Sequence, residues 1–472
     1  IDQAIAFFTG VIHAKNDDPL PYVLRARVWE AKNELDIALR DLDDALRLDP
    51  THAWAYNWRG ILWRHKHAYD KAIADHTLAI NLEPNDFHSY VNRALVFMDM
   101  NDFDKAIDDL NQANRFDPEN SKLFNKRGWA WYCKDEFDKA IGDYTQAISL
   151  DAQIEETYVN RGMAWFAKQE YDKAIADYDH ALKLDPSDAY AYNDRGWAWE
   201  SKQEHDKAIA DFDMALKCRP PFVRALTNRG IARVAKKEFQ KALDDYNQAL
   251  EIDPARERSL TYRGIALTVL GKYDRAIADF DAALKAAPTA IWPRYNRLVA
   301  YLSAGRPEAL AEARKLLQQV GWNHELAIHT ALLGHYSAIR SGQIAESQQF
   351  LKDAAAHGNT RQWSYQVVRF LRGEIQEPEL LGSATRPDQQ TEAHSFLGLH
   401  DSLTGHPDKA LSHFRWVKQN GQTSNAGYEL SSAELDRIEN QNQSRASRGS
   451  GAPLDFIGQR GPQAQARFRR LN

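Results

Sequence analysis

The sequence is poor in cysteine and contains no long apolar run. Its only cysteines are Cys133 and Cys218, so a disulfide-bonded scaffold is excluded, and neither a zinc cluster nor a redox pair is indicated. No stretch approaches the roughly 18 consecutive apolar residues that a membrane-spanning helix needs. We therefore expect no membrane span in this chain.

The chain also lacks an excess of positive charge. Its formal net charge is -6 at pH 7, whereas binding to nucleic acid or anionic lipid requires clustered positive charge. Nucleic acid is therefore disfavoured as a partner. The first residue is Ile1 rather than methionine, so the natural start is expected to lie upstream and the cellular location stays open.

No motif for catalysis is present. The sequence contains no phosphate-binding loop, no dinucleotide glycine fingerprint and no serine elbow. The segment HELAIH places His324 and His329 five residues apart, about 140 degrees around a helix, so the arrangement of a helical zinc protease is missing. We therefore predict no enzyme activity, no cofactor, no metal site and no small-molecule substrate.

What the sequence does contain is a pattern that recurs every 34 residues. An Arg-Gly pair at Arg59-Gly60 recurs at this step or its multiples as far as Arg263-Gly264. A column of alanine has the same period: Ala38, Ala72, Ala106, Ala140, Ala174, Ala208, Ala242 and Ala276. A column of proline follows it too: Pro50, Pro84, Pro118, Pro186, Pro220, Pro254 and Pro288. A fixed period of this length predicts stacked repeats.

These columns resemble the tetratricopeptide repeat family, whose 34-residue unit has a small residue at position 8, an aromatic residue at 11, alanine at 20 and 27, and proline at 32. Each unit reads as two amphipathic helices, the second ended near the proline. The resemblance implies an all-α fold, a right-handed superhelical solenoid of antiparallel helix pairs with a concave groove.

The repeat register divides the chain into five parts. Nine units cover residues 19–306 and start at residues 19, 53, 87, 121, 155, 189, 223, 257 and 291. Residues 1–18 fit the second helix of a truncated repeat, so the array is expected to begin upstream of the chain. Residues 307–390 fit degenerate helical repeats, and residues 391–439 fit a terminal repeat with a capping helix. Residues 440–472 are rich in Arg, Gln, Ser and Gly and are predicted to be a disordered tail.

The end of the array carries a second resemblance. The strings TEAHSFLGLH, GHPDKALSHFRWV and GYELSSAEL lie within residues 390–437. They resemble the closing segment of bacterial repeat proteins that include an outer-membrane lipoprotein adaptor for peptidoglycan hydrolases. This resemblance implies a bacterial adaptor, in the envelope or periplasm or in the cytoplasm, and names no partner.

Arginine occupies position 7 of all nine units, where the family commonly has leucine. Sixteen residues later, on the second helix, each of the eight regular units carries aspartate. We predict structural ion pairs between the two helices of each unit, including Arg59-Asp75, Arg93-Asp109, Arg127-Asp143, Arg161-Asp177, Arg195-Asp211, Arg229-Asp245 and Arg263-Asp279. Ala313 replaces this aspartate in the ninth unit, which would leave Arg297 without the partner. The alternative is an arginine ladder for anionic ligands, which would not need a matched acid.

Aromatic residues crowd the stripe of the first helix that faces the groove in resembling proteins, at positions 2, 5, 6, 9, 12 and 13. The candidates for peptide binding are Trp54, Trp58, Trp129, Tyr132, Phe166, Tyr190 and Trp197. Indole and phenol rings on a concave face could anchor apolar segments of a partner. The alternative is that these rings pack against the next unit. The aromatic residues at position 11, such as Trp199, are predicted to be core.

Asparagine recurs on the same stripe. The family uses asparagine at position 6 to hold a peptide backbone, which transfers to Asn92, Asn160, Asn228 and Asn296. A second set lies one residue earlier, at Asn57, Asn125 and Asn193. An amide both donates and accepts, so spaced amides can bind an extended backbone of any sequence. The alternative is that these amides are solvated at the surface.

The sequence therefore predicts a non-catalytic scaffold that binds an extended peptide or protein segment along its groove and assembles a multiprotein complex. An alternative is that the repeats recruit substrate, or set the oligomeric state, for a larger enzyme whose catalytic domain lies upstream of Ile1. Self-association of the chain is left open by the pattern. The identity of the partner does not follow from these residues.

Overall fold

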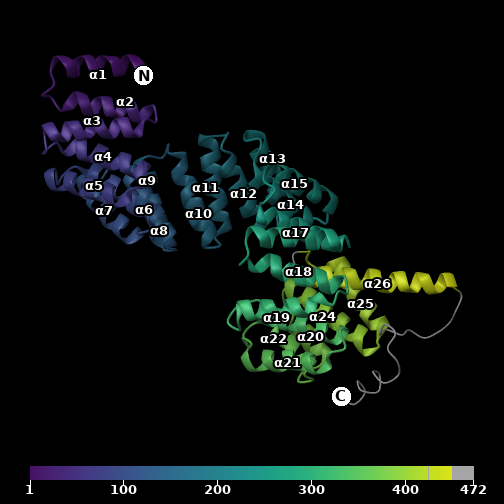
Figure 1. The fold of residues 1–472 in the computed structure, drawn as a ribbon. Helices are drawn as coiled ribbons and strands as arrows, with labels where there is room; N and C mark the ends of the chain where they lie inside the picture. The colour runs from purple at the N-terminus through teal and green to yellow at the C-terminus, as the bar shows by residue number, and fades with distance from the viewer. Residues whose placement is uncertain (424, 449–472) are drawn as a thin grey trace. The chain divides into compact units, whose positions relative to one another are not determined.

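The computed structural model describes residues 1–423 and 425–448, and every regular element in this part of the chain is an α-helix. Twenty-six helices follow one another in this described part, so the predicted all-α fold, drawn in Figure 1, is confirmed. They form two units, Ile1–Lys202 and a second unit that begins at Gln203. None of the described helices is long and apolar enough to cross a membrane.

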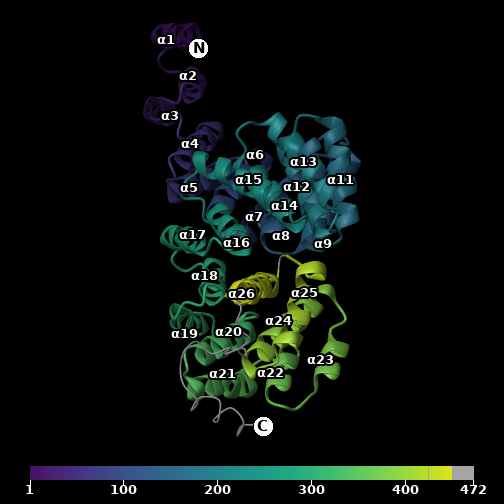
Figure 2. The ribbon, with the colours of Figure 1, turned by 90° about the vertical axis from the view of Figure 1, so that its right-hand side faces the viewer.

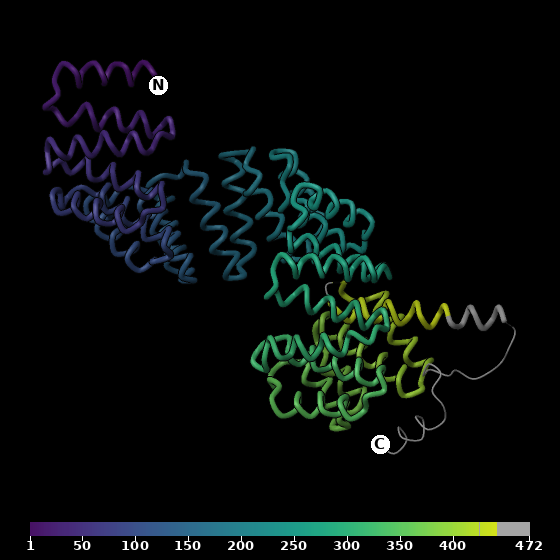
Figure 3. Tube along the Cα trace, in the orientation of Figure 1, coloured from purple at the N-terminus to yellow at the C-terminus, as the bar shows by residue number. Residues whose placement is uncertain are grey.

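The first unit is a stack of antiparallel helices (Figure 3). It begins with α1 (Asp2–Ala14). The first helices of its repeats are α2 (Leu20–Ala31), α4 (Ala53–His65), α6 (Phe87–Asp99), α8 (Ser121–Cys133), α10 (Glu155–Ala167) and α12 (Ala189–Ser201). The second helices are α3 (Leu35–Leu48), α5 (Tyr69–Leu82), α7 (Phe103–Phe116), α9 (Phe137–Leu150) and α11 (Tyr171–Leu184).

The second unit continues with the same element types. Its regular helices are α13 (His205–Cys218), α14 (Val223–Ala235), α15 (Phe239–Ile252), α16 (Glu257–Val269), α17 (Tyr273–Ala286), α18 (Ile291–Ser303) and α19 (Glu308–Val320). They are followed by α20 (Ala327–Arg340), α21 (Ile344–His357), α22 (Tyr365–Leu371), α23 (Glu377–Ser383), α24 (Pro387–Thr404), α25 (Pro407–Asn420) and α26 (Ala426–Arg448).

The turn inside each repeat has one recurring backbone geometry. At the end of α4, His67 adopts a φ of 57°, and its N–H donates to the carbonyl of Arg64 at 2.9 Å. The next N–H, that of Ala68, donates to the carbonyl of Trp63 at 2.8 Å. Two such bonds around a left-handed residue satisfy carbonyls that the end of a helix would otherwise leave free. The left-handed residues at this turn are Asn33, His67, Asn101, Asp135, Gln169, Gln203, Lys237, Gly271 and Gly305.

The small residue at position 8 lets an aromatic ring of the second helix lie directly on the backbone of the first. A Cβ added to Gly162 in α10 would lie 2.7 Å from Cε1 of Tyr178 in α11, and Tyr178 is buried. Equivalent pairs in other repeats are Gly60-His76, Gly128-Tyr144, Gly230-Tyr246 and Gly264-Phe280. The ring at position 24 is thus the group that approaches this glycine.

The glycine-ring pair also recurs in the irregular part of the second unit. Gly334 in α20 faces Phe350 in α21, and Gly398 in α24 faces Phe414 in α25, each pair separated by the same 16 residues as in the regular repeats. The two helix pairs therefore keep the internal packing of a repeat although the sequence period around them has loosened. The short helices α22 and α23 connect them.

Helix α26 extends past the position where the sequence predicted a disordered tail. The predicted boundary was residue 440, whereas α26 continues to Arg448. The segment after Glu439 contains no glycine or proline before Gly449, so nothing in it breaks a helix that has already started. The remainder of the predicted tail, 449–472, lies outside the described residues.

Replacing Gly162 by alanine should destabilise the chain, because the new methyl group would meet the buried Tyr178 ring. We expect the free energy of unfolding in denaturant to fall by roughly 1–3 kcal/mol, the usual cost of overpacking. Gly142 in α9 is the control, since nothing lies within 4 Å of a Cβ added there. Gly142→Ala should stabilise the helix by up to about 1 kcal/mol, and a loss of stability equal to that of Gly162→Ala would contradict this account.

Candidate functional site

The arginine at position 7 clamps the two helices of its own repeat. Arg59 Nε donates to Asp75 Oδ2 at 2.7 Å and Nη2 donates to Oδ1 at 2.8 Å, and Asp75 is 4% exposed. This two-point bond has the planar geometry for which arginine is suited. The same contact joins Arg25-Asp41, Arg93-Asp109, Arg127-Asp143, Arg161-Asp177, Arg229-Asp245 and Arg263-Asp279. Arg195 lies in the first unit and Asp211 in the second.

Each of these arginines also reaches back to the preceding repeat. Nη1 of Arg59 donates to Asp43 Oδ1 at 2.8 Å, and Nη1 of Arg127 donates to Asn111 Oδ1 at 2.7 Å. The acceptors, always sixteen residues before the arginine, are Thr9, Asp43, Thr77, Asn111, Thr145, Asp179, Asp213, Asn247 and Asp281. Sequence reasoning missed this column, although threonine, asparagine or aspartate at position 25 was its signal. One guanidinium thus joins three helices.

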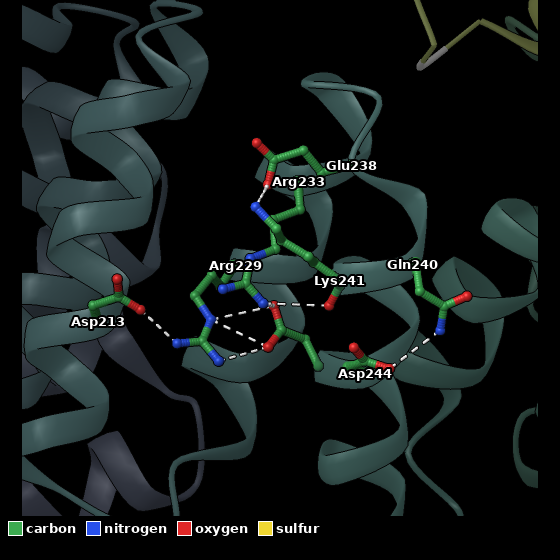
Figure 4. A network of polar contacts seen from close by, with 8 residues as sticks. Asp213, Arg229, Arg233, Glu238, Gln240, Lys241 and Asp244 are labelled. Atoms are coloured by element: carbon green, nitrogen blue, oxygen red, sulfur yellow. Dashed lines mark hydrogen bonds and ion pairs between the residues drawn. The ribbon is translucent and has the colours of Figure 1, made fainter.

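Two irregular positions show how strongly this contact is kept. Arg297 was expected to have no acid on its second helix because Ala313 replaces the aspartate; instead, its Nη2 donates to Glu312 Oε1 at 2.7 Å. In α14, Arg233 stands where other repeats carry an aromatic residue, and its Nη1 donates to Asp245 Oδ2 at 2.7 Å. Figure 4 shows Arg233 beside Arg229, which also reaches Asp213.

Burial governs the charges at this site. Asp245 is fully buried, and burial raises the pKa of its carboxyl above the ordinary value even though Arg229 and Arg233 act in the opposite direction. The hydrogen bonds to Asp75 raise the pKa of Arg59 above its ordinary value. Nε, Nη1 and Nη2 of such an arginine all donate to groups of the chain itself. The arginine column therefore holds the repeats together and does not serve as a ladder for anionic ligands.

The predicted asparagines lie between repeats and bond one another. Asn57 Oδ1 accepts from Asn92 Nδ2 at 3.1 Å, and Asn125 Oδ1 accepts from Asn160 Nδ2 at 3.1 Å. A position-5 amide therefore pairs with the position-6 amide of the following repeat, which explains why the two sets alternate. Asn57 also lies 2.8 Å from Nδ1 of the buried His76, whose pKa burial lowers to about 3.

Most of these amides are buried rather than solvated. The exposed fractions are 5% for Asn57, 9% for Asn160, 2% for Asn193, 3% for Asn228 and 5% for Asn296. The interpretation of these five as solvated surface amides is therefore wrong. Asn193 donates to Asp194 and Asn296 to the carbonyl of Trp292. Asn92 and Asn125 are half-buried.

One pocket of the first unit brings together three of the predicted binding residues. It encloses about 410 Å³ and is lined by Asn125 and Trp129 of α8 and Asn160 of α10. The other lining residues are Leu95, Met98, Lys122, Lys126, Ile154 and Glu156. Except for Ile154, these additional residues occupy positions 2, 6, 9 and 12 of the groove stripe. The sequence prediction named only aromatic and amide side chains there.

The predicted aromatic residues divide into several local groups. Tyr132 stacks on Trp129 with ring centres 5.4 Å apart, which extends the apolar wall of the pocket. Trp54 and Trp58 meet edge to face at 6.3 Å on α4, and Phe166 packs on Tyr171 across the turn of its repeat. Tyr190 is exposed and Trp197 is half-buried. The pocket is lined by none of the predicted residues Trp54, Trp58, Phe166, Tyr190 and Trp197.

The lysines of the pocket differ from several others in the first unit. Lys122 is exposed and Lys126 half-buried, and within the described residues neither has an acidic group close enough for an ion pair. By contrast, Lys134 and Lys168 pair with Asp104 and Asp138 of the preceding repeats. The pocket therefore presents two positive charges without an ion-pair partner, one helical turn apart, beside Glu156. The described part of the chain contains no group of His, Cys, Asp and Glu residues suited to a metal ion.

Family models described as tetratricopeptide repeats match residues 24–80 and 159–222, residues 87–120, and residues 223–255. No curated protein matches the chain. Among solved structures, MamA is 26% identical, with 35% of this chain and 91% of that chain covered, at a TM-score of 0.33. A tetratricopeptide repeat protein from Parabacteroides merdae is 17% identical, with 53% and 98% covered, at 0.44.

Yeast Tom70 is 15% identical, with 80% of this chain and 93% of that chain covered, at a TM-score of 0.44. Likenesses of this degree concern the repeat fold and identify no partner.

Removing one acid of the clamp should destabilise the array strongly. Asp177→Ala would leave Arg161 without its two-point partner, and both groups are largely buried, with side-chain exposures of 6% and 19%. We expect the free energy of unfolding to fall by about 2–4 kcal/mol. Asp172→Ala is the control, because this acid is 83% exposed in its pair with Lys202 and should have no measurable effect. Comparable losses in both variants, by denaturant unfolding, would show that the clamp contributes nothing beyond a surface pair.

Proposed function

This chain is a tetratricopeptide repeat protein, whose repeats form an interaction scaffold, and we propose that the first unit binds an extended protein segment at the pocket between α6, α8 and α10. The single observation that carries this proposal is the pocket itself, which gathers Asn125, Trp129 and Asn160 from two successive repeats. Proteins or peptides are the partners that such a fold serves.

The polar groups of the pocket suit a peptide backbone and a carboxylate. Asn125 uses its Oδ1 for Asn160, so its Nδ2 can donate to a backbone carbonyl of the bound segment. Lys122 and Lys126 line the same pocket without an acidic partner. A carboxylate of the partner would gain charge-assisted hydrogen bonds from them. Glu156 on the neighbouring helix disfavours a second acid at its side of the pocket.

The apolar groups of the pocket suit an anchoring side chain. Trp129, already stacked on Tyr132, faces Leu95 and Met98 of the preceding repeat across the pocket. A flexible thioether adapts to the shape of the group that it contacts, and an indole supplies a large rigid surface. The expected ligand is therefore an extended segment with an aromatic or aliphatic residue beside an acidic one.

Selection of a random peptide library on the full chain, followed by affinity measurement with a synthetic selected peptide, tests this proposal. We expect enrichment of an acidic residue next to an aromatic or aliphatic residue. Trp129→Ala should weaken binding about 30-fold, the effect of truncating an anchor worth about 2 kcal/mol. Lys126→Glu should weaken the acidic peptides selectively.

Trp292→Ala is the matched control, because Trp292 is 54% exposed on α18 and does not line the pocket. This variant should bind as the unaltered chain does. If the selected peptides bind the Trp129→Ala chain with unchanged affinity while its helicity is intact, the pocket is not the binding site.

A further inference from the structure

The last helix of the chain lies on helices that precede it by well over a hundred residues. In the second unit α26 packs against α24 and α25, its neighbours in sequence, and also against α16 and α18, as two views show (Figures 1 and 2). A helix that only covered the end of the array would contact the last repeat alone. Instead, α26 occupies a surface formed by the first helices of several repeats.

Specific contacts fix the start and the middle of this helix. Near its start, Thr423 Oγ1 donates to the carbonyl of Val234 at 3.2 Å, and Lys237 Nζ lies 5.1 Å from the Tyr428 ring centre. Farther along, Glu434 forms an ion pair with Arg340 of α20. Arg437 Nη2 donates to the carbonyl of Ser303 at 2.8 Å.

The buried face of α26 is unusually polar for a helix that completes a core. Glu429 is 3% exposed and Ser431 is 0% exposed, beside the apolar Leu430 and Leu435. Glu429 Oε2 and the hydroxyls of Ser431 and Ser432 have no hydrogen-bonding partner in the described chain. Buried polar groups without partners oppose the burial that holds the helix in place.

We propose that the surface on which α26 lies is a helix-binding site occupied by the chain's own helix, and that a partner helix of the same pattern binds there when α26 leaves. The chemistry of that partner follows from the groups now seated: leucines in place of Leu430 and Leu435, and a carboxylate in place of Glu434. Arg340, at α20, supplies the complementary charge. The proposal concerns the second unit and does not rest on the pocket of the first.

The acids of the contact make the seated state sensitive to pH. Burial raises the pKa of Glu429 and that of Glu392 in α24 to about 8 each. The groups around them are Tyr295 of α18, Tyr273 of α17 and His329 of α20, and burial keeps the pKa of His329 low, at about 4. Because these carboxyls stay protonated while they are buried, the seated helix gains its full stabilisation below a pH of about 4.5, the ordinary pKa of glutamate. This stabilisation is lost as the pH rises through about 8.

Exchange of the helix is tested with a fluorescent peptide of residues 426–440 and the full chain. Leu435→Asp with Ile438→Asp should unseat α26, since both side chains are buried, and the peptide should then bind at least tenfold more tightly than to the unaltered chain. Adding Arg340→Glu should abolish this binding, and a peptide with Glu434→Lys should restore it. Asp436→Ala, on the exposed face of α26, should behave like the unaltered chain.

Two results would overturn the proposal: equal affinity of the peptide for the unaltered and opened chains, or no binding to an opened chain whose helicity by circular dichroism is intact. If the opened chain fails to fold, hydrogen exchange of the unaltered chain decides instead. Protection of the amides of residues 428–438, corrected for the intrinsic rate and compared with α8, should fall at least tenfold between pH 5.5 and pH 8. Glu429→Gln should flatten this change, and protection that is independent of pH in the unaltered chain counts against a displaceable helix.

Discussion

The repeat architecture depends on the hydrogen bonds that the arginine guanidinium at position 7 donates. It holds the second helix of its own repeat through two bonds, as Arg59 holds Asp75, and the second helix of the preceding repeat through a third, at Asp43. Arginine can do this because its donors form a rigid planar fork. With three helices placed by one group, the glycine at the next position can lie close under a ring, as Gly60 lies under His76. The arginine and the glycine thus act together to hold the helices close to one another.

The ends of the array show what happens when the arginine contacts or the glycine-ring pair are altered. At α18 the acid has moved by one residue, yet Arg297 still bonds Glu312 and reaches Asp281. Beyond α19 the glycine-ring pair persists at Gly334 and Phe350, but the described arginines there pair differently. Arg340 bonds the carbonyl of Leu302 and Glu434 of α26. The second unit therefore closes through contacts between distant segments, in addition to the contacts between neighbouring repeats.

Periodicity explains which features could be predicted from the sequence. A column such as Arg161 and Asp177 repeats in each of the eight regular units, so the helices, the turns and the acids opposite the arginines follow from spacing. The hydrogen bond between Asn57 and Asn92 links adjacent repeats. In the sequence, this bond is reflected in the alternation of asparagine between positions 5 and 6. The contact of Thr423 with Val234 joins residues 189 apart and has no counterpart in any column. A long-range contact made once leaves no periodic signal.

The same amides that order the first unit also limit where a partner can bind. Asn57, for example, is 5% exposed, and its Oδ1 is already bonded to both Asn92 and His76. Accepting a hydrogen bond from a ligand would break those bonds, and a buried polar group left unpaired costs about 1–3 kcal/mol. Asn125 avoids this cost because it is half-buried at the pocket and its bond to Asn160 leaves its Nδ2 to donate. Its Nδ2 stays available beside Trp129 and the unpaired lysines. Asn125 therefore combines a place in the pocket, partial exposure and an amide that can donate to a bound backbone.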